Sequence, residues 1–406
     1  MNGADTAWII VATALVLFMT LPGLAPFYGG LVRARNVLSV FMHCYAIACL
    51  MSVLWLALGY SVAFGDGDSG YWGGLDKIFL LNVTSDNLSG TLPEVLFFAF
   101  QMTFAIITPA LIVGAYVERV GFAFVMAFSG LWMLLCYAPV VHWIWGGGML
   151  SDGGILGAIG VKDFAGGIVV HETAGLAALV LAFFLGSRKN KTKPPHNPGY
   201  VMIGAAMLWV GWFGFNGGSQ LAADGGAAMA LTVTHISAAA GACTWMLLER
   251  INHGKASALG AVTGMVAGLG TITPASGFVG PGGGLIIGLS AGFVCYYATG
   301  YIKRTLKIDD SLDVFPVHGV GGILGTLLTG VFASNALGVF SGQEDIVIGA
   351  QVSTQAIGIV SSIVYTAVVT FGILKVTDAL VGNRDDEEDE MQGLDLVSHD
   401  ERGYDI

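Results

Sequence analysis

Residues 163–185 read DFAGGIVVHETAGLAALVLAFFL. The stretch opens with an aspartate, and residues 164–170 are all small or apolar. His171 and Glu172 then stand side by side, and residues 174–185 are small or apolar again. Because about 20 mostly apolar residues can cross a bilayer as a helix, the stretch predicts a membrane span with two ionisable side chains inside it.

The composition of the whole chain also indicates a membrane protein. Only 11% of the 406 residues are charged and 55% are hydrophobic, whereas a soluble domain carries about 25% charged residues. The chain has 60 glycines, about twice the usual share, and small residues allow membrane helices to approach closely. These proportions exclude one large soluble core and predict an all-α integral membrane protein.

Eleven stretches are long and apolar enough to form membrane helices. They cover about residues 7–31, 38–64, 93–116, 121–141, 164–187, 199–217, 226–248, 257–273, 283–302, 314–339 and 351–379. We therefore expect a transmembrane domain over residues 1–380 and a tail over residues 381–406. The first stretch does not predict a signal peptide, because it is too long and no basic region precedes it.

The lysines and arginines indicate the orientation of these spans. If the N-terminus lies outside, fifteen of the 17 fall on the cytoplasmic side, and only Lys77 and Lys162 fall on the other. Cytoplasmic loops of membrane proteins are enriched in these two residue types. The pattern favours an odd number of spans. It predicts a multi-pass protein of the cell (inner) membrane with the N-terminus outside and the C-terminus cytoplasmic.

Acidic residues are concentrated in the tail. Ten acids and two arginines in residues 384–406 account for −8 of the formal net charge of −11. Such a tail is either a solvated extension or a regulatory arm held against the basic loops at residues 188–193 and 303–307. The five cysteines lie inside apolar stretches without a CxxC pair. We expect them to be small core residues rather than disulfides or metal ligands.

An aspartate followed by a histidine recurs five spans along the chain. The fifth span opens with Asp163 and carries His171, and the tenth opens near Asp313 and carries His318 in DVFPVHGVGG. An odd number of helices per repeat inverts the second copy, and inverted repeats are typical of transporters with a site near the middle of the membrane. We therefore predict two five-helix inverted repeats followed by a long eleventh helix. The three parts cover about residues 7–187, 199–339 and 351–379.

The two histidines have several possible roles. Ionisable groups inside a membrane are costly and mark a functional pathway by default. A single histidine there is more often a packed structural residue, but the matching positions of His171 and His318 favour a functional pair. A metal site is disfavoured, because HETAG has glycine where the zinc motif HExxH has its second histidine. We expect no metal, no cofactor and no nucleic-acid partner.

Several longer stretches carry a family resemblance. They are ALVLFMTLPGLAPFYGGLVRARN, LIVGAYVER, WGGG, DFAGGIVVH, GWFGFNGGS, TPASGF, DVFPVHGVGG and GLDLVSHDERGY. With them the chain resembles the Amt/Mep/Rh ammonium transporter family over nearly its whole length, and most closely the bacterial Amt branch. The resemblance implies a homotrimer in the membrane lipid, each eleven-helix subunit having its own narrow pore for ammonium or ammonia. It also implies regulation by a cytosolic PII-type signal protein.

The resemblance assigns an outer site for the substrate. Phe104, Trp145 and Ser219 match the residues that recruit the ammonium ion, and Phe104 stacks with Phe215 in the pair that closes the outer vestibule. Asp163 matches an aspartate near this site. We interpret Asp163 as structural support, because its place at the start of a span also fits a helix N-cap.

The resemblance also assigns the pore. His171 and His318 match the family's paired pore histidines, and Trp212 matches an aromatic residue that lines the pore beside them. Aromatic faces attract a cation by about 0.5–2 kcal/mol, but full desolvation of an ion costs on the order of tens of kcal/mol. We therefore expect ammonium to lose its proton and to pass as ammonia, with or without a separately relayed proton. Potassium has no proton to lose and is rejected.

Three alternatives remain open at this stage. An Rh-like channel for neutral gas is one, although Trp145 favours an Amt protein. The second is an ammonium sensor that acts with a separate signalling partner, because residues 381–406 leave no room for a signalling domain. The third is an intramembrane enzyme built on the two histidines and Glu172, which would lack both a third metal ligand and a nucleophile.

Glu172 departs from the family pattern, which more often has an apolar or small polar residue there. Successive residues of an α-helix are turned by about 100°, so Glu172 should point away from the direction of His171. It is then either a protonated acid buried between helices or subunits, which we favour, or a partner in proton transfer.

Overall fold

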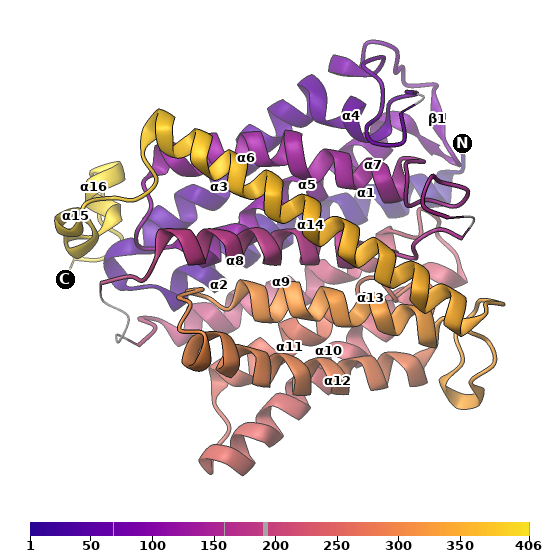
Figure 1. Cartoon of the computed structure of the whole chain (residues 1–406). Coiled ribbons are helices and arrows are strands. Elements are labelled where there is room, and N and C mark those ends of the chain that lie inside the picture. Colours follow the sequence, from indigo (N-terminus) through magenta and orange to yellow (C-terminus); the bar gives the residue numbers. More distant parts are fainter. Residues whose placement is uncertain (68, 158, 190–193, 406) are drawn as a thin grey trace.

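The computed structural model describes the chain except for residues 68, 158, 190–193 and 406. It is a bundle of helices whose axes run in roughly one direction (Figure 1). The first half contains α1 (Gly3–Phe18), η1 (Met19–Leu24), α2 (Ala25–Leu31), η2 (Ala34–Asn36), α3 (Val37–Leu54), η3 (Trp55–Gly59), α4 (Tyr60–Phe64), η4 (Ile78–Leu80), β1 (Leu88–Ser89), β2 (Leu92–Pro93), α5 (Glu94–Tyr116), α6 (Phe122–Trp132), η5 (Met133–Tyr137), α7 (Ala138–Trp145), η6 (Gly167–Glu172) and α8 (Thr173–Leu185).

The second half continues the bundle and ends in the tail. It contains α9 (Pro198–Gly218), α10 (Gly225–His253), α11 (Ala258–Ile272), α12 (Pro281–Gly300), η7 (Tyr301–Thr305), η8 (Phe315–Gly319), α13 (Val320–Phe332), η9 (Gly338–Phe340), α14 (Ile348–Val381), α15 (Glu387–Gln392) and α16 (Leu394–His399). The strands β1 and β2 form one short antiparallel hairpin. The predicted all-α class is therefore correct apart from this small outer hairpin.

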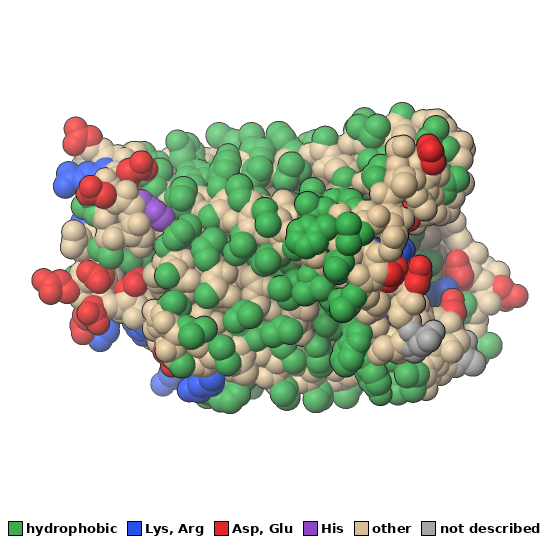
Figure 2. Space-filling view, turned by 90° about the horizontal axis from the view of Figure 1, so that it is seen from above, with side chains coloured by type: hydrophobic (Ala, Val, Ile, Leu, Met, Phe, Trp, Pro, Cys, Tyr) green, Lys and Arg blue, Asp and Glu red, His purple; other side chains and the backbone are tan. Residues whose placement is uncertain are grey.

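The helices have the lengths that a membrane requires. Among the described residues, ten helical segments are long and apolar enough to span a bilayer. Figure 2 shows hydrophobic side chains over the middle of one face and charged side chains at both ends. The predicted span at residues 257–273 is α11, which has only 15 residues, fewer than the usual 20 or so. The chain is thus a multi-pass membrane protein, and the eleventh span stays a prediction.

The two ends of the bundle differ. The acidic tail, with α15 and α16, lies at one end, which we call the tail end, and the N-terminus and the β1–β2 hairpin lie at the opposite, far end (Figure 1). The predicted tail follows α14 directly. Lys191 and Lys193, which we counted in the basic loop, lie outside the described residues.

Two short helical pairs, η6–α8 and η8–α13, place the predicted histidines. His171 lies in η6 and His318 in η8, and both segments are π-helical, a conformation often found at functional sites. The Asp163 carboxylate accepts hydrogen bonds from the backbone N–H groups of residues 166–169 at 2.6–3.1 Å. It therefore caps η6, as expected for structural support.

The aspartate equivalent to Asp163 in the second half is Asp310, not Asp313. Asp310 accepts from the backbone N–H of Phe315 at 2.7 Å, and it precedes His318 by eight residues, as Asp163 precedes His171. Asp313 instead has a positive φ of 61° and pairs with Lys303. The pattern that we read from the sequence was correct, but it was assigned to the wrong aspartate.

Glycines allow these two helical pairs to touch. A Cβ atom on Gly175 would overlap the backbone nitrogen of Gly319, and a Cβ atom on Gly322 would approach the carbonyl oxygen of Gly167. Any larger residue at these positions would push the pairs apart. The two histidines can meet only because the backbones behind them are this close.

The long helix α14 presents a polar stripe to the bundle. Its buried residues include Gln351, Gln355, Ser362, Thr366, Thr370 and Thr377. Gln355 donates to the carbonyl oxygens of Lys162 and Thr326, and Trp132 donates to Thr370. The stripe gives α14 a fixed register against the other spans, because buried polar groups in lipid need partners.

This stripe also determines where Glu172 points. The hydroxyl of Ser362 on α14 donates to Oε1 of Glu172, and Oε2 is buried without a hydrogen-bond partner among the described residues. Glu172 is thus packed between α8 and α14, away from the His171–His318 contact, as the helical turn predicted. Its part in proton transfer stays a hypothesis.

The cysteines are all free, as expected, but only three of them are core residues. Cys44, Cys136 and Cys295 are buried, whereas Cys49 and Cys243 are exposed on the surface of the bundle. The prediction was wrong for these two, because an apolar stretch does not indicate which face of a membrane helix points outward.

Candidate functional site

Three cavities follow one another along the bundle axis. The cavity nearest the far end has a volume of about 210 Å³, the middle one about 10 Å³, and the one at the tail end about 300 Å³. Phe27, Val266 and His318 line both the middle and the tail-end cavity. The stacked rings of Phe104 and Phe215 separate the middle cavity from the far-end one. Together they form one interrupted pathway.

The far-end cavity contains the residues predicted for the outer site. Phe104, Trp145 and Ser219 all line it. The rings of Phe104 and Trp145 meet edge to face at 6.0 Å between centroids. The indole N–H of Trp145 donates to the carbonyl oxygen of Asp163 at 2.7 Å, so the capping residue also fixes this ring. Ser219 donates its hydroxyl proton to the carbonyl oxygen of Phe215 at 2.8 Å, which leaves its lone pairs free to accept.

The predicted phenylalanine pair closes the bottom of this cavity. Phe104 from α5 and Phe215 from α9 stack at 4.2 Å between ring centroids with an interplanar angle of 26°. Both side chains are essentially fully buried. The far-end cavity is therefore separated from the histidines by two aromatic rings.

The middle cavity is narrow and apolar. Its volume of about 10 Å³ is close to the minimum for a single water molecule. His171 and His318 line it together with Trp212 and Phe215. The two imidazoles lie 5.1 Å apart between centroids, and their Nδ1 atoms are 3.2 Å apart. Trp212 stacks on His171 at 5.4 Å.

Thr273, at the end of α11, orients the histidine pair. Its hydroxyl donates to the carbonyl oxygen of Leu269 at 2.8 Å and accepts from the indole N–H of Trp212 at 2.9 Å. Nε2 of His171 lies 3.3 Å from the same oxygen. Because the hydroxyl proton is already used, Nε2 of His171 must be the donor.

This hydrogen-bond accounting fixes both neutral tautomers. With its proton on Nε2, His171 has a lone pair on Nδ1, and His318 must donate its Nδ1–H across the 3.2 Å contact. Nε2 of His318 is then left as an acceptor. The tautomers are assigned from the network, since hydrogen positions are inferred. Thr273 is the first residue of the motif TPASGF, and its role in orienting the histidines was not predicted from the sequence.

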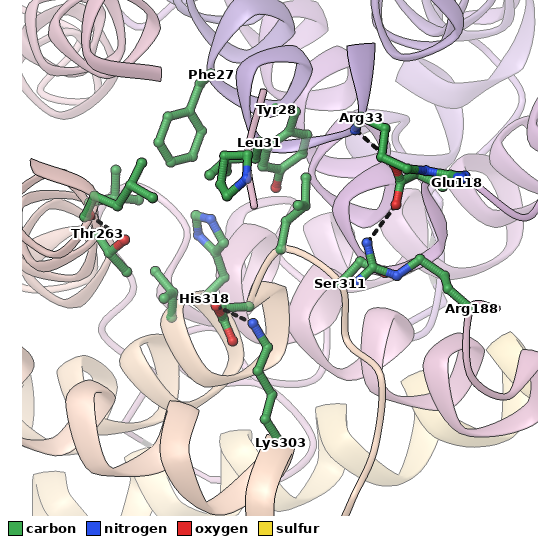
Figure 3. Close-up of a pocket in the computed structure, with 16 residues that line it drawn as sticks. Phe27, Tyr28, Leu31, Arg33, Glu118, Arg188, Thr263, Lys303, Ser311 and His318 are labelled. Carbon is green, nitrogen blue, oxygen red and sulfur yellow. Dashed lines mark hydrogen bonds and ion pairs between the residues drawn. The ribbon is translucent and has the colours of Figure 1, made fainter. Parts of the chain in front are cut away.

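The tail-end cavity is wide and carries charges. Aromatic side chains, Phe27 and Tyr28, line it near His318, and Arg33, Glu118 and Arg188 line its rim (Figure 3). None of these rim residues was predicted as part of the site. The cavity therefore links an apolar passage to a polar mouth.

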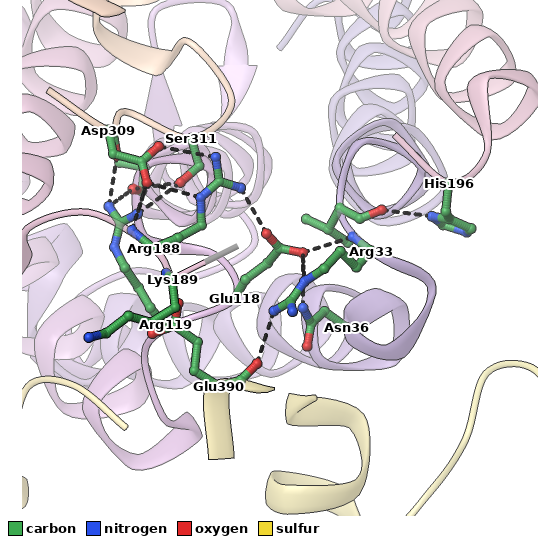
Figure 4. A network of polar contacts seen from close by, with 12 residues as sticks. Arg33, Asn36, Glu118, Arg119, Arg188, Lys189, His196, Asp309, Ser311 and Glu390 are labelled. Carbon is green, nitrogen blue, oxygen red and sulfur yellow. Dashed lines mark hydrogen bonds and ion pairs between the residues drawn. The ribbon is translucent and has the colours of Figure 1, made fainter. Parts of the chain in front are cut away.

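Glu118 joins the two rim arginines. Its Oε1 accepts from the backbone N–H and Nε of Arg33 at 2.8 and 2.9 Å, and its Oε2 accepts from Nη1 of Arg188 at 2.8 Å. Burial opposes the ionised carboxylate, but Arg188 and Arg33 outweigh it and lower the pKa of Glu118. Arg188 also pairs with Asp309, which in turn pairs with Arg119 (Figure 4).

The tail is docked onto this network. Nη2 of Arg33 donates to the carbonyl oxygen of Glu390 at 3.0 Å (Figure 4). The buried Glu390 carboxylate accepts from the backbone N–H of Lys189 at 2.5 Å and from Arg384 at 2.7 Å. Asp395 accepts from the backbone N–H of Ser39 at 2.8 Å. The tail is thus ordered against the loop at residues 188–189, not a free solvated extension.

Among the described residues, the ion pair found at the second predicted basic loop, residues 303–307, is not with the tail. Lys303 lies in the basic segment that we expected to hold the tail, but its ammonium group pairs with Asp313 at 2.6 Å. Lys303 and Asp313 both line the tail-end cavity. The charge pattern of the sequence could not show whether Lys303 pairs with the acidic tail or with Asp313, because both lie at the tail end.

Comparison with known proteins places this geometry in a family. The model of the Ammonium Transporter Family matches residues 7–404. The chain belongs to the ammonium transporter family. It is 46% identical to a putative ammonium transporter of Methanothermobacter thermautotrophicus and 43% identical to an ammonium transporter of Bacillus subtilis, with 100% of this chain and 99% of each relative covered.

Solved structures of this family agree with the fold. Saccharomyces cerevisiae Mep2 superposes with a TM-score of 0.85 at 34% identity, covering 95% of this chain and 91% of that one. A protein described as a sensor Amt superposes with a TM-score of 0.88 at 29% identity, covering 98% of both chains. The family resemblance seen in the sequence is therefore confirmed.

Replacing Thr273 by valine should impair transport without unfolding the protein. The substitution keeps the shape but removes the oxygen shared by Trp212 and His171, and an unsatisfied buried donor costs about 1–3 kcal/mol. We expect slower ammonium uptake and a lower melting temperature in detergent. Thr232→Val is a matched control, because Thr232 is exposed and its hydroxyl bonds within α10. Uptake equal to that of the control would contradict the orienting role.

Proposed function

We propose that this member of the ammonium transporter family recruits ammonium at the far-end cavity, removes its proton and conducts ammonia through the histidine-lined passage. The observation that carries the proposal is the order of the three cavities: an aromatic vestibule, a passage of about 10 Å³ and a polar mouth. A hydrated ion is too large for the middle cavity, whereas a small neutral molecule fits it.

The far-end cavity suits ammonium. Its described lining residues are uncharged and include the rings of Phe104 and Trp145 and the hydroxyl of Ser219. A cation over an aromatic face gains about 0.5–2 kcal/mol, and ammonium can donate to the free lone pairs of the serine. These attractions are far too small to offset full desolvation, which costs on the order of tens of kcal/mol. The site therefore concentrates the ion but does not carry it onward.

The histidine pair suits a neutral hydrogen-bonding molecule. In the assigned tautomers both imidazoles are uncharged, and Nε2 of His318 can accept from passing ammonia. The pair thus provides polarity without fixed charge. A recording of the current during transport tests whether the proton crosses the membrane by a separate route.

The membrane arrangement completes the proposal. The tail end carries most of the basic residues, so it faces the cytoplasm of the cell (inner) membrane and the far end faces outside. As in the family, the spans form two inverted repeats and a long last helix, the count of eleven spans includes the short helix α11, and three subunits form a homotrimer. The docked tail is a regulatory surface on which a cytosolic PII-type signal protein acts.

A sensor function is the second candidate. It is favoured by the likeness to the protein described as a sensor Amt, and it would use the same far-end site with a separate signalling partner. An Rh-like channel for neutral gas is the closest alternative within transport. The names of the relatives support a transporter and not an enzyme.

Removing either pore histidine should separate these candidates. Purified protein in a supported membrane is exposed to a jump in ammonium or potassium, and the current is recorded. We expect His171→Ala and His318→Ala to lose ammonium transport or to admit potassium, because each removes half of the polar pair. A wild-type current indicates net charge movement, and ammonia uptake without current favours neutral conduction. Unchanged uptake and unchanged potassium exclusion in both variants would rule out the histidine mechanism.

Trp145→Leu should weaken recruitment at the far end. Losing one cation–π contact of about 0.5–2 kcal/mol corresponds to a rise of roughly 2- to 30-fold in the half-saturating ammonium concentration. Uptake is measured as a function of concentration in proteoliposomes. Trp72→Leu, at an exposed tryptophan near the same end, is the control. If the concentration dependence of Trp145→Leu matches that of Trp72→Leu, the recruitment site lies elsewhere.

Deleting residues 384–406 should alter transport or PII association. The deletion removes both partners of the Arg384–Glu390 pair and the contact of Glu390 with Arg33, so the mouth loses its docked cover while the spans remain. Uptake, PII co-purification and trimer stability are measured together. A shorter deletion of residues 401–406, which keeps α15 and α16, is the control. Equal uptake and equal PII binding in all three proteins would leave the tail with no regulatory function.

A further inference from the structure

The tail-end cavity contains an ion pair that the proposed pathway does not use. Asp313 precedes η8, and Lys303 lies in η7 at the end of α12. Nζ of Lys303 lies 2.6 Å from Oδ2 of Asp313. Both residues line the tail-end cavity, which His318 also lines. The pair therefore shares a cavity with the end of the histidine passage.

Asp313 is held in an unusual conformation. Its φ of 61° lies in the left-handed region, which residues other than glycine rarely adopt. Strained backbone of this kind is concentrated at binding sites and switches. Oδ1 of Asp313 is buried and has no hydrogen-bond partner among the described residues. The carboxylate therefore has one oxygen bonded to Lys303 and a second one still able to accept.

The two arginines at the rim of the cavity have carboxylate partners of their own. Glu118 pairs with Arg33 and Arg188 through contacts of 2.8–2.9 Å, and Arg188 also pairs with Asp309 at 3.1 Å. The ion pair of Asp313 is with Lys303. Phe27 and Tyr28 line the same cavity. Without Lys303, the cavity would offer a carboxylate next to aromatic rings, which is a suitable environment for a small ammonium cation.

The side chain of Lys303 itself resembles the transported ion. It ends in a primary ammonium group with three N–H donors, and it extends into the pocket from the neighbouring helix (Figure 3). We propose that Asp313 forms a second cation site, for ammonium or a small alkylammonium ion, and that the ammonium group of Lys303 competes for it as a tethered substitute. The proposal rests on the transport function proposed above.

The competition has a kinetic purpose. Ammonia that passes His318 enters the water of the cavity and takes up a proton there, so an ammonium ion forms beside Asp313. A tethered competitor has a high effective concentration, and it prevents this ion from being retained. The same competitor reduces occupancy of the site by ammonium from the cytoplasm. The competitor changes the half-saturating ammonium concentration on the tail side. It does not change the direction of net flux, which the concentration gradient determines.

The two ends of the pathway would then differ in their affinity for ammonium. The described residues around the far-end cavity are uncharged, so nothing competes with the ion there. At the tail end, the proposed cation site at Asp313 is already occupied by Lys303 of the chain itself. The pathway binds substrate on one side and releases it readily on the other.

Lys303→Met tests the proposal in membrane vesicles of known orientation, with radiolabelled methylammonium as the probe. For transport that starts from the tail side, we expect the half-saturating concentration to fall by about 2- to 5-fold, the range for a partly exposed ion pair. Transport that starts from the far side should keep its half-saturating concentration. Lys303→Arg should behave like the wild type, and Arg304→Met, at an exposed neighbour in the same segment, controls for the loss of one cationic charge.

The double variant Lys303→Met with Asp313→Asn shows whether the carboxylate is responsible. It should restore the high half-saturating concentration on the tail side. Methylammonium titration calorimetry of the purified proteins provides a readout independent of transport, and it should show a tail-side site in Lys303→Met that the double variant lacks. Unchanged tail-side saturation in Lys303→Met, or the same change in the double variant, would overturn the proposal. Absence of methylammonium uptake by the wild type from either side would instead contradict the transport function.

Discussion

The narrow and apolar character of the short passage between Phe215 and His318, with a volume of about 10 Å³, is the constraint on which the rest of the structure depends. An ion that entered this passage would lose its hydration shell, and no contact seen there can compensate for that loss. The passage is therefore bordered by neutral rings: two stacked phenylalanines above, and an imidazole pair with an indole inside. Among the described residues that line the three cavities, charged side chains occur only at the tail-end mouth, where water and paired arginines can stabilise them.

Building such a passage requires helix ends inside the membrane, where every backbone group needs a partner. Asp163 satisfies four backbone N–H groups at the start of η6, and Asp310 caps the start of η8. Glycines behind the histidines let the two helical pairs touch, and Thr273 sets the direction of the hydrogen bonds. The passage is thus rigid, whereas the tail and the Lys303–Asp313 pair are held by exchangeable ionic contacts.

Much of this arrangement could be predicted from the sequence. Hydropathy located the membrane helices because each needs about 20 apolar residues, and repeat symmetry together with family motifs brought His171 and His318 together. Four features could not be predicted. Thr273 and Ser362, the partner of Glu172, make contacts between distant spans, and the rotation of each helix decides which side chain lies at such a contact. Asp313 was mistaken for Asp310 because spacing alone cannot identify the residue that caps a helix. Lys303 pairs with Asp313 rather than with the acidic tail. The conformation of the loops decides between these two partners, and a count of charges gives no information on it.

The most direct test of the account asks whether an N–H bond of the substrate breaks during passage. Initial rates of ammonium transport by the wild-type protein in proteoliposomes are compared in H2O and D2O, with the acidity adjusted for the shift of the ammonium pKa. The account predicts a slower rate in D2O, because ammonium must give up a deuteron before it enters the passage. Equal rates in the two solvents would mean that loss of a proton does not limit transport, and would contradict the account that deprotonation controls entry to the passage.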